Sequence, residues 1–290
     1  MKLTGLHLLL SYQCTFECDH CFVWGSPWQS GTMSLTDIRS ILQQAGDLGS
    51  ITTIYFEGGE PFLYYATLLD GVRMAVAAGF QAGIVTNVYW ATSEEDALAC
   101  LRPFAGLLHD VTISSDLFHY SEKLSRQATQ ATSAAAKLGI PISMISIARP
   151  ADGQQANGEG GVMFRGRAAA KLAAQAPLRP WDAMTQCPHE KLAAPGRVHV
   201  DALGNLHVCQ GISLGNLFRT PLSDICTHYD PAMHPITGPL LHGGPAELVR
   251  RYDLPHAAGY ADACHLCDEA RRALRPRFPE VLTPDQMYGV

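Results

Sequence analysis

The sequence has few positive charges, no long hydrophobic run and few charged residues overall. Lysine and arginine total 21 against 27 aspartate and glutamate, so the 290-residue chain carries a formal net charge of −6. This balance excludes a broad basic surface for nucleic acid or anionic membranes. No apolar run reaches the ~20 residues that a membrane-spanning helix needs. Hydrophobic residues make up 47% of the chain, too many for a disordered protein, so we expect a globular protein without nucleic-acid or membrane partners.

The N-terminus also lacks a secretory signal. One lysine precedes a short apolar run, and no small-x-small cleavage site follows it, so we interpret residues 6–12 as a buried strand. The nine cysteines are an odd number in a chain too long for a disulfide-stapled miniprotein. We therefore expect a cytoplasmic protein, in which clustered cysteines bind metal rather than each other.

The first half alternates strand and helix patterns. Helices are expected after the caps Ser34 and Thr92 and at residues 65–78, 120–138 and 167–174. Strands are expected at residues 6–12, 52–56, 83–86, 111–114, 142–147 and, as a sixth, 162–165. This rhythm predicts an α/β fold, and six units favour an open, partial (β/α)6 barrel over a closed eightfold one. Ligands of such sheets bind at the carboxyl ends of the strands.

The rhythm breaks near residue 178. Residues 197–209 predict a β-hairpin around a Gly-Asn turn, and residues 268–274 predict a helix. We divide the chain into a partial barrel at residues 1–178 and a small β-hairpin and helix domain at residues 179–290.

Three cysteines follow the first strand in a C-x3-C-x2-C loop: Cys14, Cys18 and Cys21. Three thiolates on one loop can each bind one iron of a [4Fe–4S] cluster, which leaves the fourth iron for a substrate or cofactor. The alternative is a zinc site with His20 as the fourth ligand.

The loop resembles the hallmark of the radical S-adenosylmethionine (SAM) superfamily, with His20 in the aromatic position of C-x3-C-x-aromatic-C. The second strand ends in a sequence similar to the family's GGEP motif: Gly58, Gly59, Glu60 and Pro61. The resemblance implies that this motif meets the amino group of SAM. It also implies weaker SAM contacts at the ends of the third and fourth strands, from Asn87 and Ser115. A cluster-bound SAM would be cleaved to a 5′-deoxyadenosyl radical that takes a hydrogen atom from the substrate.

A second set of cysteines lies in the C-terminal part, and its last two form a C-x2-C loop before a helix: Cys187, Cys209, Cys264 and Cys267. Four thiolates can hold zinc or an iron–sulfur cluster. The pattern resembles the auxiliary-cluster domain called SPASM, or its shorter twitch form, which implies a second [4Fe–4S] cluster able to accept an electron. We expect Cys100 and Cys226 to be structural.

Substrate-side candidates lie near the expected barrel mouth. Asp116 and His119 form either an acid–base pair or a helix cap beside a surface histidine, and Arg149 is a third candidate. Glu57, Tyr120 and Arg165 lie in the same region.

The resemblance implies a radical SAM oxidoreductase or maturase with a flavodoxin or ferredoxin as electron donor. A small alcohol or sugar-like substrate is slightly favoured, because no leader-binding N-terminal domain is visible. The alternatives are a peptide maturase that cross-links or epimerises its substrate, and a non-enzymatic zinc or iron–sulfur protein.

Overall fold

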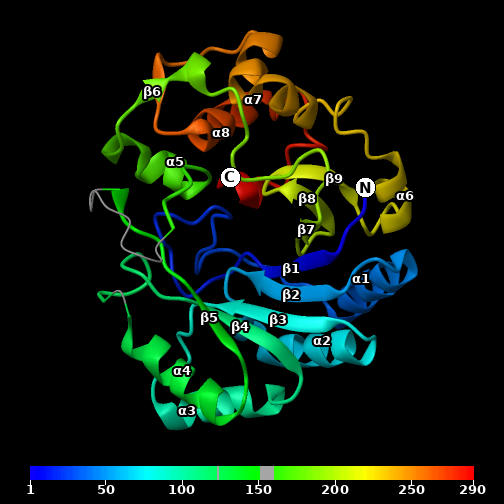
Figure 1. Ribbon diagram of the computed structural model, residues 1–290, viewed down its shortest axis with the longest axis vertical. Coiled ribbons are helices and arrows are strands. Elements are labelled where there is room, and N and C mark those ends of the chain that lie inside the picture. The colour runs from blue at the N-terminus through cyan, green and yellow to red at the C-terminus, as the bar shows by residue number, and fades with distance from the viewer. Residues whose placement is uncertain (123, 151–159) are drawn as a thin grey trace.

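A computed structural model describes residues 1–122, 124–150 and 160–290 (Figure 1). Its centre is an eight-stranded sheet with the order β5-β4-β3-β2-β1-β7-β8-β9. The strands are β1 (Gly5–Ser11), β2 (Thr53–Gly58), β3 (Gln81–Thr86), β4 (Leu108–Ser114), β5 (Ile142–Ile145), β7 (Arg197–Val200), β8 (Asn205–Cys209) and β9 (Ile212–Asn216). The prediction of an α/β fold with a largely parallel sheet is confirmed, and among the described residues the sheet does not close into a barrel.

Six strands are parallel, but the sixth is not the predicted one. Residues 162–165 form no strand, because the backbone N–H groups of Phe164 and Gly166 donate to the side chains of Asp262 and Asp268 instead of to a neighbouring strand. The position beside β1 is taken by β7, which pairs with it in parallel.

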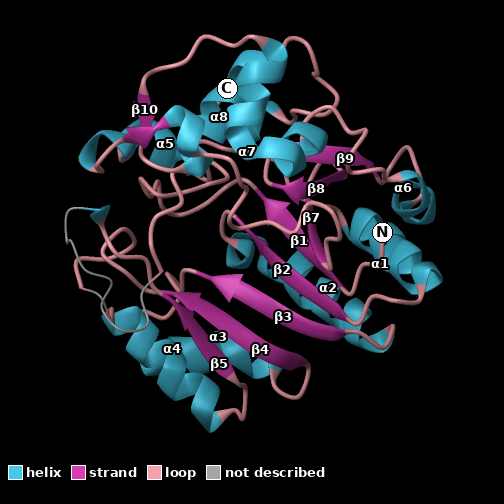
Figure 2. Ribbon diagram, turned by 45° about the horizontal axis from the view of Figure 1, so that its top comes forward, coloured by secondary structure: helices cyan, strands magenta, loops and turns pink. Residues whose placement is uncertain are grey.

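The helices α1 (Leu35–Leu48), α2 (Tyr65–Ala77), α3 (Glu94–Leu101) and α4 (Arg126–Lys137) cover one face of the sheet (Figure 2). Alternate strand residues such as Leu6 and Leu8 pack against helix residues such as Ile38 and Val72 in the largest core cluster. Ser34 caps α1 as predicted, with its side chain accepting from the N–H of Asp37.

Two predicted helix starts are wrong by a short distance. Helix α3 is capped by Ser93 with Asp96 rather than by Thr92 with Glu95. Helix α4 begins at Arg126 rather than at residue 120, because Ser125 is its cap.

The C-terminal part extends the same sheet, packs one helix, α6 (Leu222–His228), against α1 and adds further helices on the other side of the sheet (Figure 1). The helices are α5 (Arg167–Lys171), α6 (Leu222–His228), α7 (Thr237–Tyr252) and α8 (Ala263–Leu274), and a separate two-stranded sheet joins β6 (Arg179–Pro180) and β10 (Gly259–Tyr260). The predicted hairpin forms, but its turn spans residues 201–204 because the Asp201 carboxylate accepts from the N–H groups of Leu203 and Asn205.

Helix α8 starts earlier than predicted, since Asp262 caps it. Cys264 and Cys267 therefore lie in the first turns of a helix, three residues apart on one face, rather than in a loop.

No helix among the described residues is long and apolar enough to span a membrane.

Candidate active site

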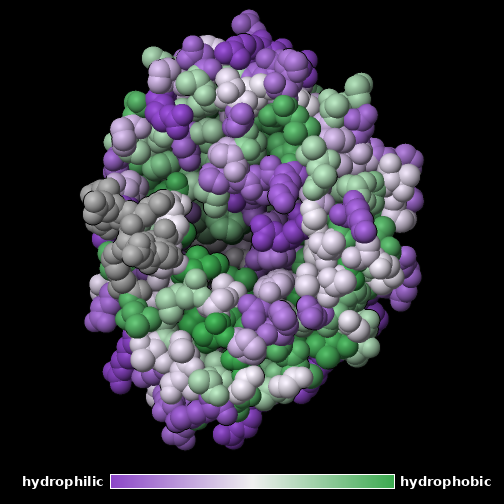
Figure 3. All heavy atoms as spheres, viewed as in Figure 1, coloured by the Kyte–Doolittle hydropathy of each residue, from purple (hydrophilic) through white to green (hydrophobic). Residues whose placement is uncertain are grey.

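A cavity of about 740 Å³ lies over the inner face of the sheet, the face opposite α1–α4. It opens on a hollowed side of the molecule where hydrophilic and hydrophobic side chains both gather (Figure 3). Its walls combine the first cysteine loop, the ends of β2 and β3, inward-facing side chains of β1, β4, β5 and β7, and residues of the C-terminal part. The parallel strands therefore direct their side chains and carboxyl ends into one chamber.

The three cysteines of the first loop all line this cavity: Cys14, Cys18 and Cys21. The N–H of Phe16 and the side-chain amide of Asn87 each approach the Cys14 sulfur at 3.5 Å, and the N–H of Gly25 approaches the Cys21 sulfur at 3.2 Å. Donors aimed at sulfur suit thiolate ligands. Burial raises the pKa of Cys14 to about 12, so its thiolate needs a bound cation to persist at neutral pH. The donor set therefore fits the cluster that the loop predicts.

The Gly58-Gly59 turn fits tightly against the loop after β1. A Cβ on Gly59 would lie 2.0 Å from the Gln13 carbonyl oxygen, and Gly58 has a φ of +134° with a Cβ position 2.5 Å from the Ser11 carbonyl oxygen. Only glycine meets both demands. Both glycines line the cavity, so the turn also leaves its backbone open to a ligand.

Glu60 faces away from the cavity and is fully buried. Its carboxylate accepts from the N–H of Asn87 at 2.8 Å, the N–H of Phe62 at 3.0 Å and the hydroxyl of Thr86 at 2.8 Å. These bonds join the ends of β2 and β3. The neighbouring Pro61 is also buried.

The remaining SAM candidates have different placements. Asn87 and His20 line the cavity, and the His20 ring stacks on Phe118 with centroids 4.5 Å apart. Burial lowers the pKa of His20 to about 4, which keeps its ring neutral. Ser115 is fully buried, and its hydroxyl accepts from the N–H of Ser125 at the start of α4.

Asp116 and His119 form a pair and also a turn. Their side chains lie 2.8 Å apart, while the Asp116 carboxylate accepts from the N–H groups of Phe118, His119 and Ile147. His119 lines the cavity, whereas Asp116 is buried behind it. Arg149 lies apart from both; it is exposed, donates to the Leu117 carbonyl and borders a separate pocket on the outer side of the cysteine loop.

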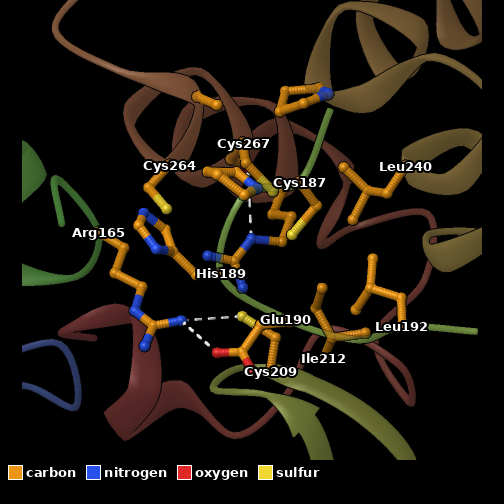
Figure 4. A pocket seen from close by; sticks show the side chains of 14 residues that line it. Arg165, Cys187, His189, Glu190, Leu192, Cys209, Ile212, Leu240, Cys264 and Cys267 are labelled. Atoms are coloured by element: carbon orange, nitrogen blue, oxygen red, sulfur yellow. Dashed lines mark hydrogen bonds and ion pairs between the residues drawn. The ribbon is translucent and has the colours of Figure 1, made fainter. Parts of the chain in front are cut away.

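The four C-terminal cysteines converge on a second pocket, although Cys187, Cys209 and the pair on α8 come from separate elements (Figure 4). Arg165 and Glu190 line both this pocket and the large cavity. Arg165 is 6% exposed and donates to Glu190 at 3.0 Å and to the Cys209 sulfur at 3.3 Å. One ion pair, with its arginine buried and its glutamate half-buried, thus lies between the two sites.

The four sulfur atoms are not gathered as around a single zinc ion. Around a tetrahedral zinc with Zn–S bonds of about 2.3 Å, sulfur atoms lie about 3.8 Å apart. Among the described residues, no three of these four sulfurs lie within 4.8 Å of one another. Burial raises the pKa of Cys267 to about 12, as for Cys14.

Sequence reasoning missed a row of polar side chains across the inner face of the sheet. His199, His7, Tyr55, Gly83 and Asp110 are register neighbours on five adjacent strands. Tyr55 passes over Gly83 and donates to Asp110 at 2.6 Å. A histidine inside the apolar run of β1 was the available signal.

The comparisons agree with this geometry. Residues 8–149 match the model of the Radical SAM superfamily. Residues 8–149 therefore carry a radical SAM domain, the mark of a family that uses SAM and a [4Fe–4S] cluster.

One curated relative is the putative peptide biosynthesis protein YydG of Bacillus subtilis (strain 168), 28% identical over 111 residues. The match covers 38% of this chain and 35% of the relative, so the chain spans about a third of the relative's length. BtrN in complex with AdoMet and 2-DOIA is 17% identical, with a TM-score of 0.54 over 79% of this chain and 84% of that one. Native anSMEcpe with bound AdoMet and Cp18Cys peptide is 13% identical, with a TM-score of 0.52 over 96% of this chain and 98% of that one. These two structures show a shared fold.

Proposed function

We propose that this protein is a radical SAM oxidoreductase with an auxiliary [4Fe–4S] cluster in its C-terminal part. The observation that carries the proposal is that the two cysteine sites are neighbours. Arg165 and Glu190 line both the cavity of the first cysteine set and the pocket of the second. When bound, the first cluster and SAM supply a 5′-deoxyadenosyl radical that takes a hydrogen atom from the substrate. A second, fully ligated cluster beside the same cavity suits removal of an electron from the substrate.

Different residues of the chain would hold the first cluster and SAM. Cys14, Cys18 and Cys21 would bind the first cluster, and Asn87 donates toward it. Gly58 and Gly59 would present backbone to SAM, while Glu60 acts indirectly by fixing the ends of β2 and β3.

The second cysteine set, Cys187, Cys209, Cys264 and Cys267, would bind the auxiliary cluster. The place of this set beside the cavity of the first one favours a redox-active cluster over a structural zinc site. In this proposal residues 179–290 form the auxiliary part, although β7 to β9 share the sheet of the radical SAM domain.

The cavity favours a small polar substrate. Hydroxyl, imidazole and carboxylate groups line its floor, and the cluster and SAM would fill part of its volume of about 740 Å³, which leaves room for a small molecule. In this proposal His119, which lines the cavity and pairs with buried Asp116, would exchange a proton with that substrate. The second candidate is a peptide maturase, which the similarity to YydG favours.

The test is anaerobic reduction of the reconstituted enzyme with SAM. Release of 5′-deoxyadenosine from the intact chain, and its loss in Cys14→Ala, would support the radical SAM activity. Reduction without SAM cleavage would refute it and leave a non-enzymatic metal protein. Incubation in deuterated substrate mixtures, one of polyols and one of peptides, then asks which class transfers deuterium to 5′-deoxyadenosine.

A further inference from the structure

Three metal-binding side chains meet on the floor of the cavity, away from both cysteine sets. They are His7 on β1, Glu57 on β2 and His199 on β7, three adjacent parallel strands. One ligand atom of each lies within 4.8 Å of the others. All three residues line the cavity.

The separations match those of a mononuclear metal site. The Nδ1 atom of His7 lies 2.8 Å from a Glu57 oxygen, and the Nε2 atom of His199 lies 3.3 Å from the other. Metal–ligand bonds of about 2.0–2.2 Å place neighbouring donor atoms about 2.8–3.1 Å apart in octahedral geometry and about 3.3–3.6 Å apart in tetrahedral geometry. Two imidazoles and one carboxylate are the ligand set of many iron, zinc and manganese sites.

Hydrogen bonds alone do not give every polar atom around this group a partner. The His199 Nε2 atom lies 3.3 Å from both the Glu57 carboxylate and the Gln210 amide nitrogen. A ring nitrogen either donates to the carboxylate or accepts from the amide, so one proton cannot serve both contacts. The Oε1 atom of Gln210 and the Nδ1 atom of His199 are buried without partners, and the two residues are only 5% and 6% exposed.

Turning the Gln210 amide places its oxygen against His199 Nε2 and leaves the amide nitrogen as the unpartnered atom instead. In that orientation Gln210 Oε1 becomes an oxygen donor beside His199 Nε2, next to the group that His7, Glu57 and His199 form. A divalent cation can accept lone pairs from imidazole, carboxylate and amide oxygen together.

The other two groups of this kind are already committed. In the group of His20, Asp116 and His119, both carboxylate oxygens accept backbone N–H bonds. In the group of His189, Asp262 and Cys264, the carboxylate oxygens accept from the N–H groups of His265 and Phe164.

We propose that His7, Glu57, His199 and Gln210 bind a divalent metal ion whose open positions face the cavity. The ion would hold an oxygen atom of the substrate, such as a hydroxyl or carboxylate group. This substrate role rests on the proposed function, whereas metal binding itself does not.

The test uses Mn²⁺ alone, because this hard ion avoids thiolates and the cysteine sites. The holoenzyme with its iron sites filled is titrated without SAM or substrate, and free Mn²⁺ is counted by its EPR signal. We expect one bound ion per chain whose pulsed EPR spectrum shows coupling to histidine nitrogen. Since loss of an outer-shell partner alone weakens metal sites by about 10–100-fold, Glu57→Gln and His199→Gln should weaken binding at least about tenfold.

His119→Gln tests the second ligand group, and His256→Gln, at an exposed histidine, is the matched surface control. Both should retain the ion. Absence of binding below millimolar Mn²⁺, or equal binding in Glu57→Gln, would overturn the proposal and leave a hydrogen-bonded trio. Circular dichroism of each variant separates loss of the ion from loss of the fold, and 5′-deoxyadenosine release by the wild type reports on the proposed function separately.

Discussion

Arg165 should set the reduction potential of the proposed auxiliary cluster. Its guanidinium is buried and donates to the Cys209 sulfur at 3.3 Å. A charged donor on a ligand sulfur stabilises the reduced, more negative cluster, so its loss should lower the potential.

The magnitude follows from the strength of such a bond. Hydrogen bonds to charged groups contribute about 1.5–3 kcal/mol. The bond exists in both oxidation states of the cluster. If it is stronger in the reduced state by about half of its energy, the difference is ~0.7–1.5 kcal/mol, which for one electron is about 30–65 mV. Arg165→Gln should therefore shift the potential by about this amount to more negative values, and Arg165→Lys should shift it less because the charge remains.

The assay is an EPR-monitored redox titration. Alanine replacements of Cys14, Cys18 and Cys21 remove the first cluster, so the auxiliary signal is read alone. The matched control is Arg251→Gln, which breaks an exposed Arg251–Glu247 ion pair at 3.2 Å without touching either cavity. Four irons per chain in each variant would show that the site still assembles. A potential unchanged within about 10 mV, or one shifted to more positive values, would refute the reasoning.

Three further predictions test the second cysteine site and the buried polar groups that support the fold. Cys264→Ala/Cys267→Ala should lower bound iron from about eight to about four per chain. About four irons in both the wild type and the variant, with zinc lost only from the variant, would instead make the second site structural. Burial raises the pKa of Glu60 to about 7, so the folded state binds more protons than the unfolded state between about pH 4.5 and 7. The Glu60 contribution to stability should fall as pH rises through that window, against the opposite contribution of His20, whose pKa is lowered to about 4. Glu60→Gln should therefore make the slope of urea stability against pH more positive than in the wild type, and parallel slopes would contradict this. Tyr12 donates to buried Asp201 at 2.9 Å, so Tyr12→Phe should reduce the free energy of unfolding by about 1–3 kcal/mol in chemical denaturation, and a change below about 0.5 kcal/mol would count against it.

Local patterns were enough to predict the first five strands and the cysteine loop. Leu6, Leu8 and Leu10 alternate with inward residues, and Ser34 and Gly49 bracket α1. Such patterns involve only a few consecutive residues, so they can be recognised from the sequence without tertiary information.

The sixth parallel strand depended on contacts that no local pattern contains. Residues 162–165 have the apolar character of a strand, yet their surroundings are side-chain carboxylates from residues 262 and 268. Strand β7 pairs with β1 across about 190 residues of sequence, and its short run Arg197–Val200 resembles one arm of any hairpin. The position of the sixth strand is therefore decided by long-range packing rather than by propensity.

The two faces of the sheet explain why the substrate side was the hardest part to predict. Closed (β/α)8 barrels fill their interior with branched aliphatic side chains. Here the largest apolar cluster lies between the sheet and its outer helices and a second one lies under the C-terminal helices, while the inner row presents His199, His7, Tyr55 and Asp110 to an open cavity. Because the hydrophobic core is complete without this row of polar side chains, the row contributes little hydrophobic stability. Its side chains are suited to binding a ligand instead. Substitutions there should alter binding more than unfolding, in contrast to Glu60 or Tyr12, whose polar groups are fully enclosed.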